Sequence, residues 1–396
     1  MTLYLDHNAT TPPAAAVLQA MLEGSLTHWA NPSSTHALGQ DARQVLSVAR
    51  AKVAAWLGCK PNELVFTSGA TEANQMALRG AVGRLGRQGL VLSRGEHAAS
   101  RKLAQHLADA HGVPVAWMGL LADGSLDLEQ ARSLITPEVS LVSLMAANNE
   151  TGVLMPTQQV AEWAHAQGVF LHVDATQWVG KLPFDFATLG ADLASLSAHK
   201  FGGPKGVGAL IIKQGVSWPA LFQGSQERAR RGGTENLPGI LGMATAAELN
   251  THTPQAWASQ SSRLAALRDH LAQGLCAAMP ATVIYGGAQP RLPNTLFLRF
   301  GRLHADLVLQ RLERLGVMAS SGSACSSSGN EPSAVLTAMG VPRDEALCAV
   351  RLSLPPHLSV DQVEWLLQHL PREFAPLLVD APFTESHFET ASGVTA

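Results

Sequence analysis

Lys200 has the most unusual surroundings of the seven lysines in the chain. It lies in the segment Ser195-Leu-Ser-Ala-His-Lys-Phe-Gly-Gly-Pro-Lys-Gly-Val-Gly208. Ser197 and His199 flank it with a hydroxyl and an imidazole, groups that can hold a phosphate. An amine with a lowered pKa beside them can form a Schiff base with an aldehyde. The segment favours a bound phosphorylated aldehyde, although a lysine between a strand and a glycine-rich turn can also serve packing alone.

Asp174 extends this hypothesis. It follows the apolar run Val169-Phe-Leu-His-Val173 and precedes Ala-Thr-Gln177. An ionised carboxylate that faces a pyridine nitrogen keeps the ring protonated, so that the ring accepts electrons. Gln177 could hold a phenolic oxygen of the same ring. The alternative for Asp174 is a plain helix N-cap.

The segment Thr67-Ser-Gly-Ala-Thr-Glu-Ala-Asn74 follows one predicted strand and opens a helix. Backbone N–H groups near Ala70 and the Thr71 hydroxyl would meet at a positive helix end, where phosphate binds well. A simple capping box, with Ser68 or Thr71 as the cap, explains the same residues.

Two more polar segments follow predicted strands. His97, in Glu96-His-Ala98, could lie over a ring and move protons near neutral pH, or it could be structural. Asn149, in Asn148-Asn-Glu-Thr-Gly152, could contact a cofactor or substrate, or simply belong to a turn. Because open α/β sheets bind ligands at the carboxyl ends of their strands, we expect all these groups to meet there.

Cys325 is the one thiol in Ser320-Ser-Gly-Ser-Ala-Cys-Ser-Ser-Ser-Gly-Asn-Glu-Pro-Ser333. These small polar residues cannot build a core, so Cys325 is expected to be exposed and mobile. Cys59, Cys276 and Cys348 have apolar neighbours, and we expect them to be buried and inert.

The elements that position these groups alternate between helices and strands. Apolar periodicity near 3.6 predicts helices at residues 14–23, 37–57, 72–85, 100–111, 156–167 and 255–278. Short β-rich runs predict strands at residues 64–67, 90–93, 113–117, 141–146, 169–174, 193–197 and 208–212. Such alternation predicts βαβ units and a mostly parallel sheet.

The elements become shorter and fewer after Leu292, which favours a second, α+β domain. There we expect strands at residues 295–299, 317–320 and 350–353 and helices at 305–315 and 360–369. The predicted division is an N-terminal segment (1–15) packing with the small domain, a large domain (16–255), a small domain (256–375) with the Cys325 loop at about 321–332, and a mobile tail (376–396). A chain of 396 residues is long enough for two cores.

The composition excludes several classes of protein. With 46% hydrophobic and 15% charged residues, the chain is typical of globular proteins. A net charge of −3 without any Lys/Arg block argues against nucleic-acid binding. We find no secretory signal or apolar run approaching 18 residues, and the scattered cysteines indicate neither a zinc site nor a disulfide framework. A cytoplasmic protein without a membrane or resident metal is the resulting expectation.

Taken together, the chain resembles the cysteine desulfurases of the NifS/IscS type, which are class V members of the fold-type I pyridoxal-phosphate-dependent transferases. The resemblance extends from Tyr4-Leu-Asp-His-Asn-Ala-Thr-Thr-Pro12 to Arg351-Leu-Ser353. It implies an α/β fold with a large domain, built on a mostly parallel seven-stranded sheet, and a smaller α+β C-terminal domain.

The resemblance also implies a role for each candidate residue. Lys200 would bond the cofactor aldehyde, Asp174 would face the ring nitrogen, Gln177 the phenolic oxygen, and His97 would stack on the ring as an acid and base. The implied phosphate contacts are Ala70, Thr71, Ser197 and His199. Asn149 would contact cofactor or substrate, and Arg351 would receive the substrate carboxylate through its planar fork, unless it pairs with a structural carboxylate.

Two implied features reach beyond a single chain. In Gln223-Gly-Ser-Gln-Glu-Arg-Ala-Arg-Arg-Gly-Gly-Thr-Glu-Asn236, which is similar to the family's arginine-rich loop, Thr234 would reach the phosphate of a neighbouring subunit, so a homodimer is expected. Cys325 would take the sulfur of L-cysteine as a persulfide, release L-alanine and hand the sulfur to an iron–sulfur scaffold or another acceptor, with at most a transient iron–sulfur contact at Cys325.

The chain departs from the family at two places. Ala30 precedes Asn-Pro-Ser-Ser where the family usually has glycine, and residues 374–396 lack the motif with which the IscS branch contacts its scaffold. The acceptor, its pathway and a preference for cysteine over selenocysteine therefore stay open. The alternatives are a selenocysteine lyase, another class V aminotransferase or lyase, and a binding protein without pyridoxal phosphate.

Overall fold

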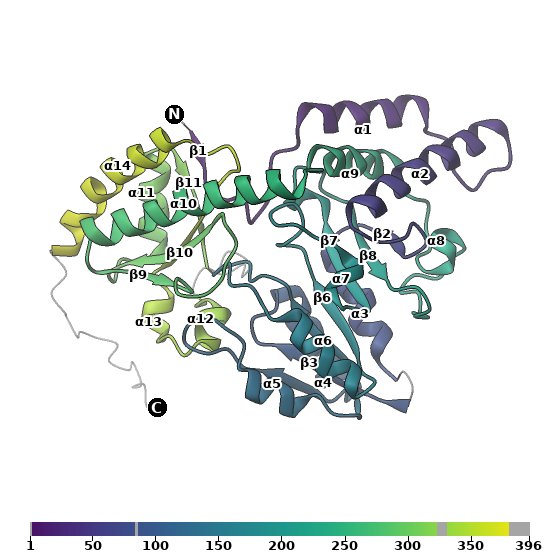
Figure 1. The fold of residues 1–396 in the computed structure, drawn as a ribbon, viewed down its shortest axis with the longest axis horizontal. Coiled ribbons are helices and arrows are strands. Elements are labelled where there is room, and N and C mark those ends of the chain that lie inside the picture. The colour runs from purple at the N-terminus through teal and green to yellow at the C-terminus, as the bar shows by residue number, and fades with distance from the viewer. Residues whose placement is uncertain (1, 84–85, 323–330, 380–396) are drawn as a thin grey trace, which may run out of the picture.

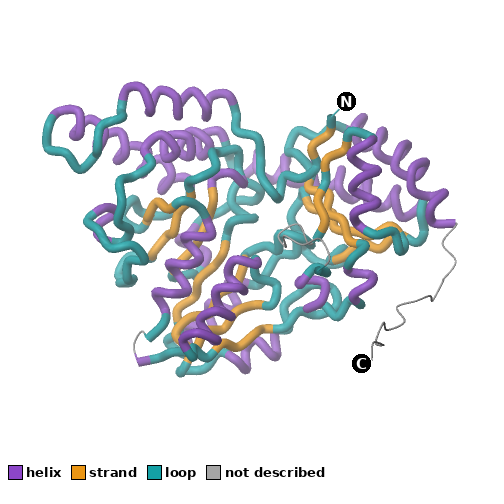
Figure 2. The backbone as a smooth tube through the Cα atoms, turned by 180° about the vertical axis from the view of Figure 1, so that it is seen from behind, coloured by secondary structure: helices purple, strands orange, loops and turns teal. Residues whose placement is uncertain are grey.

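The computed structural model describes residues 2–83, 86–322 and 331–379. Cys325 and most of the predicted tail, residues 380–396, lie outside the described residues. The strands fall into two separate groups, as Figure 2 shows. Within the described ranges, no helix combines the length and the apolar character needed to cross a bilayer.

The larger sheet has seven strands in the order β2-β8-β7-β6-β5-β3-β4. Their bounds are β2 Leu64–Thr67, β3 Gly89–Ser93, β4 Val115–Met118, β5 Val139–Met145, β6 Phe170–Asp174, β7 Leu193–Ser197 and β8 Gly208–Ile212. Strand β8 runs antiparallel to β2 and β7, whereas the other neighbours are parallel. The predicted mostly parallel sheet of seven strands is confirmed.

Alternate side chains of these strands enter two different cores, because successive residues of a strand point to opposite faces. On one face, Leu90, Leu141 and Leu210 pack with helices α3 (Ala70–Ala81) and α4 (Ala98–His111). The opposite face is covered by six helices: α1 Ala15–Thr27, α2 Ala37–Trp56, α5 Leu128–Leu134, α6 Thr157–Ala166, α7 Phe186–Leu189 and α9 Leu237–Leu249. With both faces covered, the strands read as apolar runs.

The smaller sheet is antiparallel and has the order β12-β13-β10-β9. Its strands are β9 Thr282–Tyr285, β10 Thr295–Phe300, β12 Ser320–Ser321 and β13 Ala349–Ser353. The helices of this region are α10 Pro254–Ala278, α11 Ala305–Arg314, α12 Ala334–Ala338, α13 Arg343–Ala346 and α14 Val360–Val379. A third core lies between this sheet and helices α10, α11 and α14 (Figure 1). The exact domain boundaries stay a prediction.

The N-terminal segment begins in a separate two-stranded sheet, forms a bridge from Asp6 to Ser353 in the smaller sheet and then reaches the larger one. Strand β1 (Leu3–Tyr4) pairs in parallel with β11 (Val317–Met318), and the Leu3 and Leu5 side chains belong to the third core. A few residues later, the Thr11 backbone N–H donates to the His199 carbonyl at 2.8 Å. Residues 5–11 therefore connect the two sheets beside the segment that carries Lys200.

The described structure differs from the sequence prediction in its helices: α14 ends later than predicted, and six helices were not predicted, namely α5, α7, α8 (Gln226–Ala229), α9, α12 and α13. Helix α9 was not predicted, because it is apolar on all sides and has no 3.6 period; it is buried against α1 and α2. Helix α14 continues ten residues beyond the predicted end at His369, through Pro371 and Pro376. Phe374 explains the extension: it is fully buried and stacks on Phe300 with the ring centroids 4.9 Å apart, which offsets the backbone bonds lost at the prolines.

Candidate active site

The carboxyl ends of the central strands surround one cavity of about 570 Å³. Nine of the ten predicted cofactor-contact residues line it: Ala70, Thr71, His97, Asn149, Asp174, Gln177, Ser197, His199 and Lys200. They come from five different strand ends and the turns that follow them. The structure thus brings the residues together at the edge of the sheet where open α/β folds bind ligands.

Lys200 ends a short 3-10 turn, Ala198–Lys200, directly after β7. The turn is closed by the Gly203 N–H, which donates to the Ala198 carbonyl at 2.9 Å. The Lys200 ammonium reaches back to the N-terminal segment, where Nζ donates to the carbonyl oxygens of Asn8 at 2.7 Å and Ala9 at 2.8 Å. The amine is therefore held inside the cavity by backbone acceptors.

Asp174 is 4% exposed and ends β6. Its Oδ2 accepts from Asn74 Nδ2 at 2.7 Å and its Oδ1 from the Thr176 N–H at 3.0 Å. Each oxygen of the Asp174 carboxylate therefore accepts a hydrogen bond. Asn74, on α3, was not singled out from the sequence; its own Oδ1 is buried and without a hydrogen-bond partner in the described structure.

One part of the cavity is lined by the start of α3. The N-cap residue is Gly69, which offers no side-chain acceptor, so the capping-box alternative for Ser68 and Thr71 is wrong. Instead, the Ser68 N–H donates to Glu72 Oε2 at 2.8 Å. Strand β8 approaches closely here, since a Cβ on Gly208 would lie 2.7 Å from the Gly69 Cα. A twelve-residue helix without a side-chain cap leaves its first N–H groups for an anion.

His97 is the N-cap of α4. Its Nδ1 accepts from the Ala99 N–H at 3.2 Å, so the proton of the neutral ring resides on Nε2. Burial is the largest cause that lowers the His97 pKa; the positive charges of Lys200 and Arg101 add to it and the Asp174 carboxylate opposes it. The imidazole is therefore neutral at pH 7 and can accept a proton.

Asn8 is a site residue that the sequence reasoning missed. It is 1% exposed, and its carbonyl oxygen accepts from Lys200 Nζ at 2.7 Å and from Gln177 Nε2 at 3.0 Å. Its side chain points to the smaller sheet, where Nδ2 donates to Thr295 Oγ1 at 2.9 Å and Oδ1 accepts from Asn294 Nδ2 at 3.1 Å. One residue thus joins both sheets to the Lys200 amine.

Lys181 is the second missed residue. Its Nζ donates to Asn8 Oδ1 at 2.7 Å and to Gln177 Oε1. Burial lowers its pKa well below the usual value, and the charges of Lys200 and Arg351 add to this effect. Neither Asn8 nor Lys181 directly follows a predicted strand, so the pattern of polar residues at strand ends does not indicate them. The sequence feature that could have indicated Lys181 is the small number of lysines in the chain.

Arg351 lies on β13 behind the cavity and does not line it. Its Nη1 donates to the Asn149 carbonyl at 2.8 Å, and its Nη2 forms an ion pair with Asp6 Oδ1 at 2.7 Å. The Nε is buried and has no hydrogen-bond partner among the described residues. Asp6 is thus the structural carboxylate of the alternative interpretation of Arg351. Binding of the substrate carboxylate by Arg351 stays a prediction.

Thr234 is the one predicted cofactor residue outside the 570 Å³ cavity. It lines a separate hollow of about 130 Å³ next to Ser68 and Gly206. The loop before it is fixed by Glu227, whose buried carboxylate pairs with Arg50 through bonds of 2.5 and 2.8 Å. Within one chain, Thr234 does not complete the cavity around Lys200.

A model of the family described as aminotransferase class-V matches residues 3–366. This chain belongs to that family. The match covers both sheets and every site residue described above, so the class-V assignment and the cavity at the strand ends agree.

Among similar proteins, a cysteine desulfurase of Cereibacter sphaeroides is 42% identical over 384 residues, which is 96% of this chain and 98% of the relative. A cysteine desulfurase of Sinorhizobium fredii is 42% identical over 93% of this chain and 95% of its own length.

Two solved structures have the same class-V fold. A NifS-like protein superposes with a TM-score of 0.85 at 33% identity, covering 94% of this chain and 99% of its own. SspA in complex with cysteine superposes with a TM-score of 0.78 at 30% identity, covering 90% of this chain and 100% of its own.

Proposed function

We propose that this class-V protein is a cysteine desulfurase, which converts L-cysteine to L-alanine and passes the sulfur to Cys325 as a persulfide. The observation that carries the proposal is the single cavity where the Lys200 amine, the Asp174 carboxylate, the neutral His97 ring and an uncapped helix N-terminus meet. The cysteine desulfurases that match nearly the whole chain support it.

Pyridoxal phosphate fits the groups of this cavity. The Lys200 amine would bond its aldehyde, and the Asp174 carboxylate, held by two donors, would face its ring nitrogen. Gln177 would contact the phenolic oxygen, and the first turn of α3 with Thr71, Ser197 and His199 would hold the phosphate. When bound, pyridoxal phosphate withdraws electrons from the Cα of an amino acid and makes its proton acidic.

The residues of this chain then have distinct tasks. The Lys200 amine takes and returns the proton of the substrate Cα. The neutral His97 imidazole accepts the proton of a thiol, and Arg351 binds the substrate carboxylate. The Cys325 sulfur forms a bond with the substrate sulfur as the Cβ–S bond breaks. Cβ is reduced to the methyl group of alanine, while Cys325 is oxidised to the persulfide.

We also infer a homodimer in which Thr234 serves the partner's site, because it does not line the Lys200 cavity of its own chain. Helix α1 supports this inference: Leu18, Leu22 and Leu26 recur every four residues and are 51%, 53% and 68% exposed. A second copy would cover such a stripe, since monomers rarely expose contiguous apolar surface. The sulfur acceptor is an iron–sulfur scaffold or another acceptor protein.

An anaerobic assay tests the proposed reaction. Purified protein is given L-cysteine and dithiothreitol, and alanine and sulfide are both measured for wild type, Cys325→Ala and the control Cys276→Ala, a partly buried thiol on α10. We expect equal amounts of both products from wild type and control, and at least a 100-fold loss in Cys325→Ala. Alanine formation without dependence on Cys325 would indicate a lyase, and neither product would indicate an aminotransferase.

A further inference from the structure

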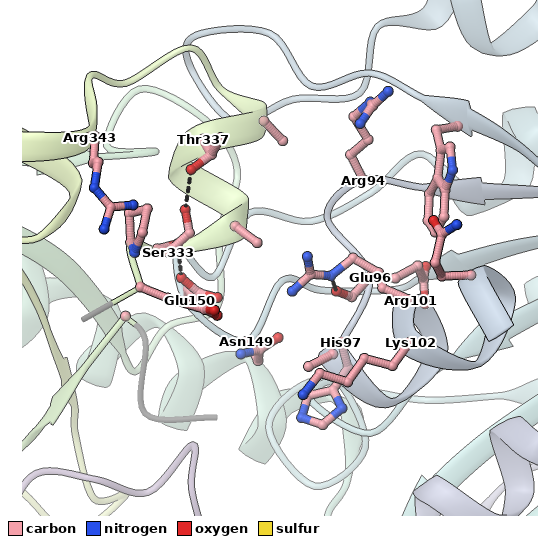
Figure 3. Close-up of a pocket in the computed structure, with 18 residues that line it drawn as sticks. Arg94, Glu96, His97, Arg101, Lys102, Asn149, Glu150, Ser333, Thr337 and Arg343 are labelled. Carbon is pink, nitrogen blue, oxygen red and sulfur yellow. Dashed lines mark hydrogen bonds between the residues drawn. The ribbon is translucent and has the colours of Figure 1, made fainter. Parts of the chain in front are cut away.

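A cavity of about 830 Å³ forms a cleft next to the active site. One wall is formed by the turn after β3 and by α4, with Arg94, Arg101 and Lys102; the other carries α12 and Arg343 (Figure 3). Asn149 lies on the floor between the walls. We call this space the cationic cleft.

Among the described residues that line the cationic cleft, four carry a permanent positive charge and three are carboxylic acids. Arg94 and Lys102 are exposed, and Arg101 is held in place by its Nε, which donates to the Glu96 carbonyl at 2.9 Å. Of the lining carboxylates that the structure describes, Glu331 alone is exposed. A chain with a net charge of −3 thus concentrates four cations around one cleft.

The other two carboxyl groups of the lining are turned inward. Glu96 Oε1 accepts from the Met145 N–H at 2.6 Å, and Glu150 accepts from the Ser333 hydroxyl. Burial raises the pKa of Glu96 to about 8 and that of Glu150 to about 7. Both groups therefore carry less negative charge near neutral pH than exposed carboxylates would.

The cationic cleft adjoins the active-site cavity. His97 and Asn149 line both the cleft and the 570 Å³ cavity. Gly322 and Glu331, which precede and follow the segment containing Cys325, also line the cleft. An acceptor that approaches the active-site cavity through the cleft passes between Arg94, Lys102 and Arg343.

We propose that the cationic cleft binds acidic residues that flank the acceptor cysteine of the protein that receives sulfur. This inference rests on the proposed function. In the transfer, the acceptor thiolate attacks the outer sulfur of the Cys325 persulfide; a sulfur–sulfur bond forms on the acceptor, the bond at Cys325 breaks, and Cys325 leaves as a thiolate. No further oxidant or reductant is needed. A concave site of this size suits a short extended peptide with two or three carboxylates.

Two synthetic peptides test the proposal as sole acceptors. The sequences are Gly-Asp-Glu-Cys-Glu-Asp-Gly and its neutral counterpart Gly-Asn-Gln-Cys-Gln-Asn-Gly, each with blocked ends. Peptide persulfide is measured by mass spectrometry with L-cysteine under anaerobic conditions, and alanine is measured in parallel. Because opposite charges accelerate association and salt screens them, we expect the acidic peptide to react about tenfold faster at low salt, with the ratio falling toward one in 0.5 M NaCl.

Charge reversal in the cleft provides the decisive comparison. The double variant Arg94→Glu/Lys102→Glu should bring the acidic-to-neutral rate ratio to one or below. The control, Lys213→Glu/Arg314→Glu, reverses two exposed cations outside the cleft and should keep the wild-type ratio. The inference would be overturned by equal rates with both peptides in wild type, or by an unchanged rate ratio in the cleft variant. In either case, alanine formation would still support the proposed function. Loss of alanine in the wild type would overturn both.

Discussion

At the residue scale, the candidate site combines side chains from strand ends with residues from other parts of the chain. Parallel strands bring Lys200, Asp174 and His97 to one edge of the large sheet, and for this reason these three residues could be predicted from the sequence. Asn8 and Lys181 could not, since their importance comes from hydrogen bonds across more than 170 residues. Those bonds depend on how the N-terminal segment crosses the molecule, which local patterns do not encode.

His97 gives a prediction at this scale. In the variant His97→Asn, the amide oxygen can still cap α4, but no group can accept a proton, so kcat/KM should fall by about 10²–10⁴. The acidic limb of the wild-type pH profile should lie below pH 6.5, because burial lowers the His97 pKa, and it should disappear in the variant. His106→Gln, exposed on the same helix, is the control. An acidic limb that persists in His97→Asn would assign it to another group.

Glu96 predicts how stability depends on pH. Its pKa is about 8 in the folded protein and 4.5 in an unconstrained chain, so between these values the folded state retains a proton that the unfolded state has lost. Stability should therefore decrease as pH rises, by at most about 1.4 kcal/mol per pH unit from this group. In Glu96→Gln this contribution vanishes.

Urea unfolding at pH 7 and pH 8 measures this effect most cleanly, because Glu150, with a pKa of about 7, contributes chiefly below that range. The pH-dependent loss should be smaller in Glu96→Gln than in wild type. Glu313→Gln, an exposed residue on α11, should behave as wild type. Equal losses in all three proteins would mean that Glu96 ionises normally.

At the element scale, all seven predicted strands of the large sheet are present, because each is a short apolar run bounded by turn residues. The antiparallel direction of β8 could not be predicted, since an apolar strand has the same pattern in either direction. Helix α9 and the end of α14 were missed for a related reason: burial on all sides removes the 3.6 period, and packing of Phe374 overrides the two prolines.

The segment of residues 5–11 gives the prediction at this scale. The variant Asn8→Ala removes the side-chain bonds to Lys181, Asn294 and Thr295 and keeps the carbonyl that holds Lys200. We expect kcat to fall about tenfold and stability to fall by about 1–3 kcal/mol, as for buried polar groups left without partners. Asn8→Ser should recover part of both, and Asn62→Ala, exposed before β2, should change neither. A loss of stability at normal kcat would make Asn8 purely structural.

At the scale of the whole molecule, the described residues form three hydrophobic cores and three sheets. Two features have no role within a single chain. These are the exposed leucine stripe of α1 and the position of Thr234 outside the cavity. The separate antiparallel sheet agrees with the change in element length after Leu292. The link between the sheets through the first eleven residues could not be predicted, because it depends on pairing between residues that lie more than 300 positions apart in the sequence.

Subunit mixing tests the inferred dimer. A dimer formed from one Lys200→Ala chain and one Thr234→Val chain contains one site with both changes and one with neither, provided that Thr234 serves the partner. Co-expressed and separately tagged chains should therefore yield mixed dimers with about half of the wild-type activity, although each parent dimer is defective. If Thr234 serves its own chain, both sites of the mixed dimer carry one defect and no activity returns.

The path of the N-terminal segment also constrains the order in which the protein is made. Leu3 pairs with Val317, and the Asn8 N–H donates to the Ser353 hydroxyl at 2.9 Å, so these partners are separated by more than 300 residues. A ribosome releases Lys200 and the whole large sheet long before it synthesises residue 353. In the nascent chain, Lys200 is therefore present before Asn8 can form its hydrogen bond to Ser353. The contacts of Asn8 are complete only after β13 has been synthesised.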